Sequence, residues 1–174
     1  MNKILISIKP KWVAKILNGE KTLEIRKTAP KCELPCEVYI YCTKNEYLYR
    51  TNKGYFASKK PLRVGKGTEY TFAYSDEGMV VAKFTLNKIV PIVMQHGGLG
   101  DMGYGYCAHE DFEWYWNIED KTCVSYDELK KYFNGKDGYA WHIHNLKIFD
   151  KPKELKDYGV KCSPQSYCYC EVEE

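Results

Sequence analysis

A short helix that ends in a tight turn and is followed at once by a strand most constrains the fold of this chain. Apolar residues repeat at helical spacing over residues 10–18. Asn18-Gly19 is typical of a helix end, because glycine tolerates a left-handed backbone. Residues 22–27 then alternate polar and apolar side chains, which is the pattern of a half-buried strand. The alternation predicts two opposite faces, a core face of Leu23 and Ile25 and a second face of Thr22, Glu24 and Arg26.

The rest of the pattern indicates many short strands and few helices. Ser125 and Glu128 form a capping box, which predicts a helix over residues 126–133 that ends at Asn134-Gly135. The 174 residues contain no internal repeat and no linker rich in Pro, Gly and Ser, so we expect one α+β domain over residues 1–174. Apolar and alternating runs predict strands at residues 3–8, 37–43, 79–86, 89–94, 139–149 and 166–172.

Charge is distributed unevenly along the sequence. Residues 1–87 hold 16 basic and 8 acidic residues, whereas residues 88–174 hold 10 basic and 15 acidic residues. All three arginines lie in the first half, and the net charge of the whole chain is +3. This asymmetry favours a surface that binds a polyanion, unless the two halves fold together and mix their charges.

Several observations on composition predict a cytoplasmic protein without a membrane segment or a cofactor. No stretch approaches the roughly 20 apolar residues of a transmembrane helix, and the first apolar run stops at Lys9-Pro10, too early for a signal peptide. The eight cysteines are therefore expected to be free thiols. A metal site is the alternative for the cysteines, although Cys107-x-His109 and Cys168-x-Cys170 lack the usual spacing. His142 and His144 lie two residues apart on a predicted strand and should share one face, as a metal pair, an acid–base pair or hydrogen-bonded structural histidines.

Residues 44–67 form a second candidate surface, because they are strongly basic and rich in tyrosine. Cations that follow phosphates, with rings between them that stack on bases, suit single-stranded nucleic acid. The alternative is a solvated surface insertion. The cations predicted to contact nucleic acid are Arg50, Lys53, Lys59, Lys60 and Arg63.

The spacing Gly19-x-Lys21-x-x-Glu24-x-Arg26 places a cation, an anion and a second cation at one sheet edge. Arg26 can bind a phosphate or a carboxylate with two hydrogen bonds. Glu24 can accept from a base amino group or orient Arg26. Lys21 can contact phosphate, or lose its proton if it is desolvated. The alternative is a surface Glu–Arg pair of little energetic weight.

This block resembles the ASCH domain family of the PUA-like superfamily, whose hallmark Gly-x-Lys-x-x-Glu-x-Arg is matched without a departure. The resemblance implies a small, mostly antiparallel β-barrel with flanking short helices, and it marks residues 44–77 and 95–123 as insertions. Further segments look like later strands and the tail of bacterial and phage-type members: Tyr39-Ile-Tyr-Cys-Thr, Gly78-Met-Val-Val-Ala-Lys-Phe, Trp141-His-Ile-His-Asn-Leu-Lys-Ile-Phe-Asp-Lys-Pro and Pro164-Gln-Ser-Tyr-Cys-Tyr.

For function, the resemblance implies RNA or nucleotide binding in a cleft beside the motif. The expected ligand-binding residues are Lys9, Lys11, Lys21, Glu24 and Arg26. Some small relatives are amidohydrolases of an acetylated cytidine, which suggests Lys21 as nucleophile or stabiliser and Glu24 as general base. That branch has threonine at the position of Glu24, a departure in this chain. Metal-dependent RNA cleavage is a third alternative.

Overall fold

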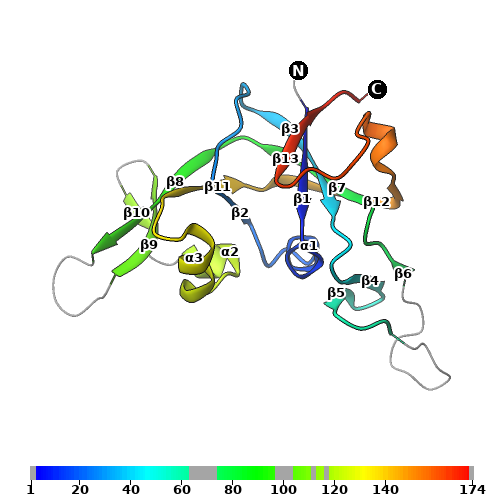
Figure 1. The fold of residues 1–174 in the computed structure, drawn as a ribbon, viewed down its shortest axis with the longest axis horizontal. Coiled ribbons are helices and arrows are strands. Elements are labelled where there is room, and N and C mark those ends of the chain that lie inside the picture. Colours follow the sequence, from blue (N-terminus) through cyan, green and yellow to red (C-terminus); the bar gives the residue numbers. More distant parts are fainter. Residues whose placement is uncertain (1–2, 63–73, 97–103, 111–112, 116–117, 173–174) are drawn as a thin grey trace.

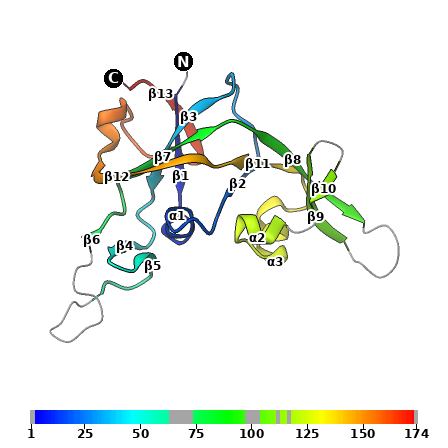
Figure 2. The same cartoon turned by 180° about the vertical axis from the view of Figure 1, so that it is seen from behind.

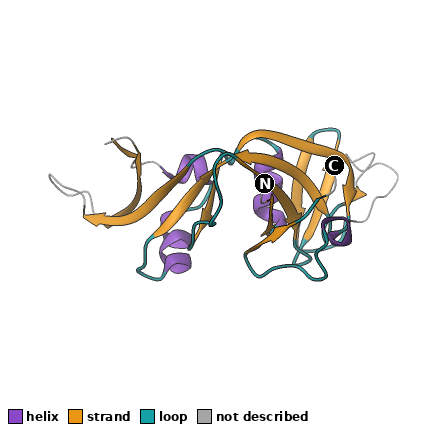
Figure 3. Cartoon of the chain, turned by 90° about the horizontal axis from the view of Figure 1, so that it is seen from above, coloured by secondary structure: helices purple, strands orange, loops and turns teal. Residues whose placement is uncertain are grey.

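The structure is a computed structural model that describes residues 3–62, 74–96, 104–110, 113–115 and 118–172. Most elements are short strands, which form two five-stranded sheets and one three-stranded sheet (Figure 1). The helices are short and lie against the strands, as the view from above shows (Figure 3). They are α1 (Pro10–Leu17), α2 (Ile118–Thr122), α3 (Tyr126–Phe133) and the single 3-10 turn η1 (Leu155–Tyr158).

The first sheet has the strand order β12-β7-β3-β1-β13. Strands β1 and β3 run parallel, and the other neighbouring pairs run antiparallel. Its strands are β1 (Lys3–Ile8), β3 (Cys36–Cys42), β7 (Val80–Leu86), β12 (His144–Lys153) and β13 (Tyr167–Cys170).

The second sheet has the order β10-β9-β8-β11-β2, and the third has the order β5-β4-β6. All of their pairings are antiparallel. The α+β class with mostly antiparallel strands and short helices is therefore confirmed. The closed barrel and the single domain over residues 1–174 stay predictions. The strands are β2 (Leu23–Arg26), β8 (Ile89–His96), β9 (Tyr104–Glu110), β10 (Glu113–Tyr115) and β11 (Gly138–His142), with β4 (Tyr47–Thr51), β5 (Gly54–Ser58) and β6 (Tyr74–Ser75).

Local signals at the helix ends are confirmed. Ser125 and Glu128 form both hydrogen bonds of the capping box at the start of α3, and Asn134 ends that helix in the left-handed conformation. The predicted strand over residues 139–149 is wrong in one respect, because the chain changes sheets in the middle of it. The backbone N–H of Ile143 donates to the carbonyl of Thr22, and β12 then begins in the first sheet.

Helix α1 lies between the core beneath the first sheet and the core beneath the second sheet. Its buried face contributes Val13 and Ile16 to the core beneath the first sheet, while Leu23 and Ile25 lie in the core beneath the second sheet, as predicted. Trp12 packs against both cores. Figure 2 shows α1 between the β4–β5 hairpin on one side and α2 and α3 on the other. In the described part of the chain, no helix is long and apolar enough to span a membrane.

Candidate functional site

Strand β2 carries the motif at the edge of the second sheet, where it pairs with β11. The turn before the strand contains Gly19 at a φ of +76°, a conformation that favours glycine. The register sets Glu24 opposite Trp141 and Arg26 opposite Tyr139. Directly opposite residues in a sheet share a face, so these four side chains are neighbours on one side of the sheet.

Lys21 is 2% exposed and lies in the turn that precedes β2. Its ammonium donates hydrogen bonds of 2.8 Å to the carbonyls of Leu23 and Thr122, and it lies 3.4 Å from Glu24 Oε2. Burial lowers the pKa of Lys21, while the Glu24 carboxylate opposes that effect. The ammonium has three protons, so these three contacts can use all of them. A ligand contact by Lys21 stays a prediction.

Glu24 lies between two cations and is 4% exposed. Its Oε1 is 3.1 Å from Arg26 Nη2. Arg26 in turn donates a 2.7 Å hydrogen bond to the backbone carbonyl of Ser7 on β1, which links the two five-stranded sheets. With Lys21 on its other oxygen, Glu24 completes a buried group of one anion and two cations. The alternative of an exposed Glu–Arg pair is therefore excluded.

Buried polar atoms without a hydrogen-bond partner among the described residues gather around this group. They include Arg26 Nε and Glu24 Oε2, the latter with only the 3.4 Å ion pair to Lys21. The indole nitrogen of Trp141, which lies opposite Glu24 in the sheet, is in the same condition. Native proteins satisfy most buried polar groups, so such a concentration needs an explanation. The set contains two N–H donors and one acceptor.

Sequence reasoning missed Ser7, Thr122 and Trp141. Their contribution depends on strand register and on contacts distant in sequence: Thr122 lies 101 positions from Lys21. Thr122 also ends α2, within the segment predicted to be an insertion, so this insertion helps to build the motif site. A sequence signal for Trp141 was available, because it alternates with Tyr139 and Ile143 on one face of the strand predicted over residues 139–149.

Comparison with solved structures identifies the fold. A crystal structure of the ASCH protein from Zymomonas mobilis matches with a TM-score of 0.57 and 18% identity, covering 96% of this chain and 86% of that chain. Two mutants of that protein match similarly: one with a TM-score of 0.56 and 18% identity, covering 96% of this chain and 87% of that chain, the other with 0.57 and 17%, covering 97% and 90%.

The chain has the ASCH fold. No protein-family model and no curated protein matches it. At this level of identity the structural match establishes the ASCH fold alone, so the roles of individual residues must come from the geometry of this chain.

The two lysines expected to extend the site of the ASCH fold differ in their contacts. Lys9 is exposed at the start of α1. Lys11 forms a 2.8 Å ion pair with Glu128 of α3, and its ammonium lies 4.1 Å from the centroid of the Trp12 ring. Lys11 therefore helps to fix α3 against α1, whereas Lys9 has an exposed side chain that can meet a ligand.

The predicted basic surface over residues 44–67 is divided by the structure. Arg50 donates hydrogen bonds of 3.0 and 2.6 Å to the carbonyls of Asp150 and Phe149, and thereby fastens β4 to β12. Lys53 and Lys59 are exposed at opposite ends of β5, about 20 Å apart at strand spacing. Lys60 is exposed beside Lys59, and Arg63 lies outside the described residues. Nucleic-acid binding by these cations stays a prediction.

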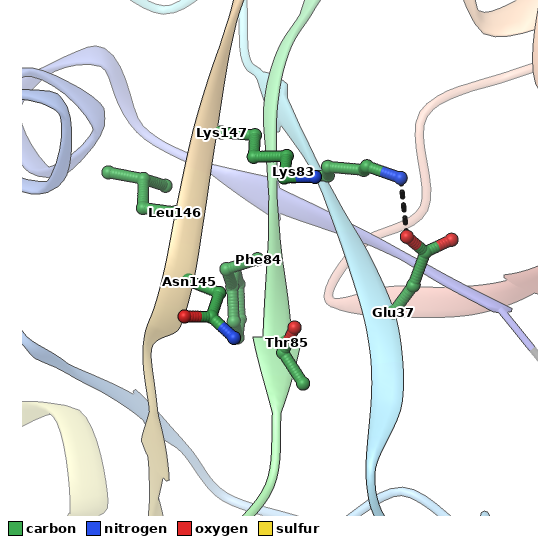
Figure 4. A pocket seen from close by; sticks show the side chains of 7 residues that line it. All are labelled: Glu37, Lys83, Phe84, Thr85, Asn145, Leu146 and Lys147. Atoms are coloured by element: carbon green, nitrogen blue, oxygen red, sulfur yellow. Dashed lines mark hydrogen bonds and ion pairs between the residues drawn. The ribbon is translucent and has the colours of Figure 1, made fainter.

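A cavity of about 350 Å³ lies on β3, β7 and β12, and no motif residue lines it (Figure 4). It opens at a bulge of β12, where Asn145 has a φ of +48° and the register to β7 shifts. An ion pair between Glu37 and Lys83 crosses one side of it. The lining residues are Glu37, Lys83, Phe84, Thr85, Asn145, Leu146 and Lys147.

The candidate metal ligands do not converge. Within the described ranges, no three side chains of His, Cys, Asp or Glu are close enough to hold a metal ion together. The expectation that His142 and His144 share one strand face is wrong, because His142 ends β11 in the second sheet and His144 begins β12 in the first. All eight cysteines are free thiols.

Proposed function

We propose that this chain binds an RNA or a nucleotide-like ligand at the motif, beside Glu24 and Arg26. The observation that carries the proposal is a group of buried polar atoms that have no hydrogen-bond partner among the described residues: Glu24 Oε2, Arg26 Nε and Trp141 Nε1. Because the cluster contains both donors and an acceptor, it suits the edge of a nucleobase, which carries both types of group. The two cations around Glu24 favour a ligand with negative charge.

In this proposal the motif residues have different tasks. Lys21 holds the Glu24 carboxylate and the α2 backbone, and so it positions the acceptor without contacting phosphate. Glu24 accepts from an amino group of the base. Arg26 bridges β2 and β1 and directs its remaining N–H groups to the sugar or phosphate.

Fluorescence polarisation with labelled single-stranded RNA tests the proposal. We expect affinity that falls with salt, because binding to phosphate releases counterions. Trp141→Phe keeps an aromatic ring and removes an indole N–H that has no hydrogen-bond partner among the described residues. It should weaken binding while urea titration shows that the variant is folded. Glu20→Gln is the control, since Glu20 is exposed and pairs with Lys15 on the surface. Affinity that does not respond to salt or to Trp141→Phe contradicts the proposal.

An amidohydrolase of acylated nucleosides is the second candidate. Burial lowers the pKa of Lys21, and the neighbouring carboxylate of Glu24 could serve as a general base. Mass spectrometry of acylated nucleosides incubated with the protein decides this point. Loss of an acyl mass that disappears in Lys21→Met supports the enzyme, while no new product with folded protein argues against it. Metal-dependent RNA cleavage finds no cluster of ligands to build on in the described part of the chain.

A further inference from the structure

Exposed apolar side chains concentrate around the loop that follows the motif strand. Among the described residues, the large apolar side chains that are exposed are Leu34, Tyr132, Ile148 and Tyr169. Leu34 lies in this loop itself, between β2 and β3. Tyr132 and Tyr169 contact it: the Lys27 ammonium is 5.1 Å from the Tyr132 ring centroid, and the Lys31 N–H donates a 2.7 Å bond to the Tyr169 hydroxyl.

A row of rings connects this surface with the motif. Trp141, opposite Glu24 in the sheet, contacts Tyr167 edge-on with 5.2 Å between ring centroids. Tyr167 contacts Tyr169 in the same way at 6.4 Å. Trp141 is fully buried, whereas Tyr169 is 46% exposed. The row therefore leads from the interior beside Glu24 to the surface of the edge strand β13.

Hydrogen bonds hold the outer rings in place. The Tyr167 hydroxyl donates a 3.1 Å bond to the carbonyl of Ala29, and the Tyr169 hydroxyl accepts from the backbone of Lys31. These hydrogen bonds orient both tyrosine side chains toward residues 29–31 of the loop. A ring fixed in this way while its face remains exposed loses little conformational entropy when a flat ligand stacks on it.

The loop beside the rings carries a net positive charge over residues 26–32, with exposed acids at Glu33 and Glu171 next to it. Lys27 and Lys31 are exposed, and residues 26–32 contain three cations and no acid; Glu33 is the first acidic residue after them. The Lys27 ammonium lies over the exposed Tyr132 ring, and the backbone of Lys31 bonds the exposed Tyr169. Proteins that bind single-stranded nucleic acids combine cations with such exposed rings. The β4–β5 hairpin differs, because its central cation Arg50 is fastened to the backbone of β12.

We propose that single-stranded nucleic acid extends from the motif across this loop, with one base stacked on Tyr169 and the phosphates beside Lys31 and Lys27. The inference rests on the proposed function, because it takes the motif as the place where the first nucleotide is held. It places the nucleic acid along β13 and residues 27–31 and not on the β4–β5 hairpin.

The test compares a labelled single-stranded RNA of roughly a dozen nucleotides with a mononucleotide competitor. Tyr169→Ala should weaken binding of the RNA about tenfold, since stacking on one ring contributes on that scale, and leave the mononucleotide affinity unchanged. Tyr169→Phe keeps the ring but removes the hydroxyl that the Lys31 N–H bonds, so its affinity for RNA should lie between those of the natural chain and Tyr169→Ala. Lys31→Ala should lower the affinity and its salt dependence, whereas Lys59→Ala, an exposed lysine on the hairpin, should do neither.

The outcomes separate this inference from the proposed function. RNA binding that is weakened in Trp141→Phe but unchanged in Tyr169→Ala and Lys31→Ala overturns the proposed path over residues 27–31 and leaves the motif site standing. If Lys59→Ala lowers the RNA affinity and Lys31→Ala does not, the RNA lies on the β4–β5 hairpin, and the proposed path over residues 27–31 is overturned. If neither the RNA nor the mononucleotide binds the folded chain, both proposals fail.

Discussion

Replacement of Glu24 by glutamine should destabilise the chain far more than an ordinary loss of an ion pair. The carboxylate lies 3.4 Å from Lys21 Nζ and 3.1 Å from Arg26 Nη2, and it is the anion between these two cations. Glutamine keeps the shape and removes the charge. Lys21 is 2% exposed, so its ammonium would remain in the interior without a counterion, and the guanidinium of Arg26 would face it.

The expected magnitude follows from the burial of the group. Removing one partner of a buried ion pair costs about 3–5 kcal/mol, because an uncompensated charge stays behind. For a chain of this length each kcal/mol corresponds to about 2–4 °C in Tm, so Glu24→Gln should lower Tm by about 6–20 °C. Lys21→Met together with Glu24→Gln should recover part of the loss, since the double variant removes the stranded ammonium.

Urea titration and thermal unfolding measure both variants. The matched control is Glu20→Gln, because Glu20 pairs with Lys15 at 2.8 Å but both side chains are largely in water. Exposed pairs contribute about 0–1 kcal/mol. Although Glu20 lies closer to its lysine than Glu24 does, Glu20→Gln should therefore lower the free energy of unfolding less than Glu24→Gln. If Glu24→Gln costs no more than Glu20→Gln, or if Lys21→Met gives no recovery, the reasoning from burial is refuted.

Three further predictions concern packing and pH. Asn18→Ala should cost about 1–3 kcal/mol and speed amide exchange in β5, because the Asn18 amide bonds both the N–H and the carbonyl of Tyr55. Gly138→Ala should strongly lower Tm, since a methyl group there would stand 2.0 Å from a ring carbon of Phe133. Burial raises the pKa of Cys170 from 9.0 to about 11. The folded chain keeps this proton longer than the unfolded chain, so the free energy of unfolding should fall between pH 9 and 11, and Cys170→Ala should make that fall shallower in urea titrations.

Local sequence patterns predicted the parts of the fold that depend on neighbouring residues. The alternation around Leu23 and Ile25 gave the core face of β2 correctly, because period two decides which side chains share a face. The capping box at Ser125 is present for the same reason, since both partners lie within one turn. The change of sheets at Ile143 could not be predicted, because it depends on a bond to Thr22, far away in the sequence.

At the motif site, too, the sequence predicts which residues are adjacent but not how deeply they are buried. The motif spacing indicates which charges will be adjacent, and Lys21, Glu24 and Arg26 do form one group. It does not indicate whether water reaches them. In the basic segment over residues 44–67, composition predicts that Arg50 is a surface cation for nucleic acid. Composition cannot reveal that the Arg50 guanidinium donates to backbone carbonyls of β12.

Burial of the motif is supplied by segments outside it, and this decides what the motif can do. The α2 carbonyl of Thr122 and the β1 carbonyl of Ser7 accept from the two cations. Without α2, Lys21 would lose the Thr122 carbonyl as an acceptor and part of its cover from water. The same eight-residue motif would then be a more solvated and less selective charge cluster. The segment predicted to be an insertion therefore makes the motif a buried polar site, and substitutions in α2 should change ligand affinity without touching the motif itself.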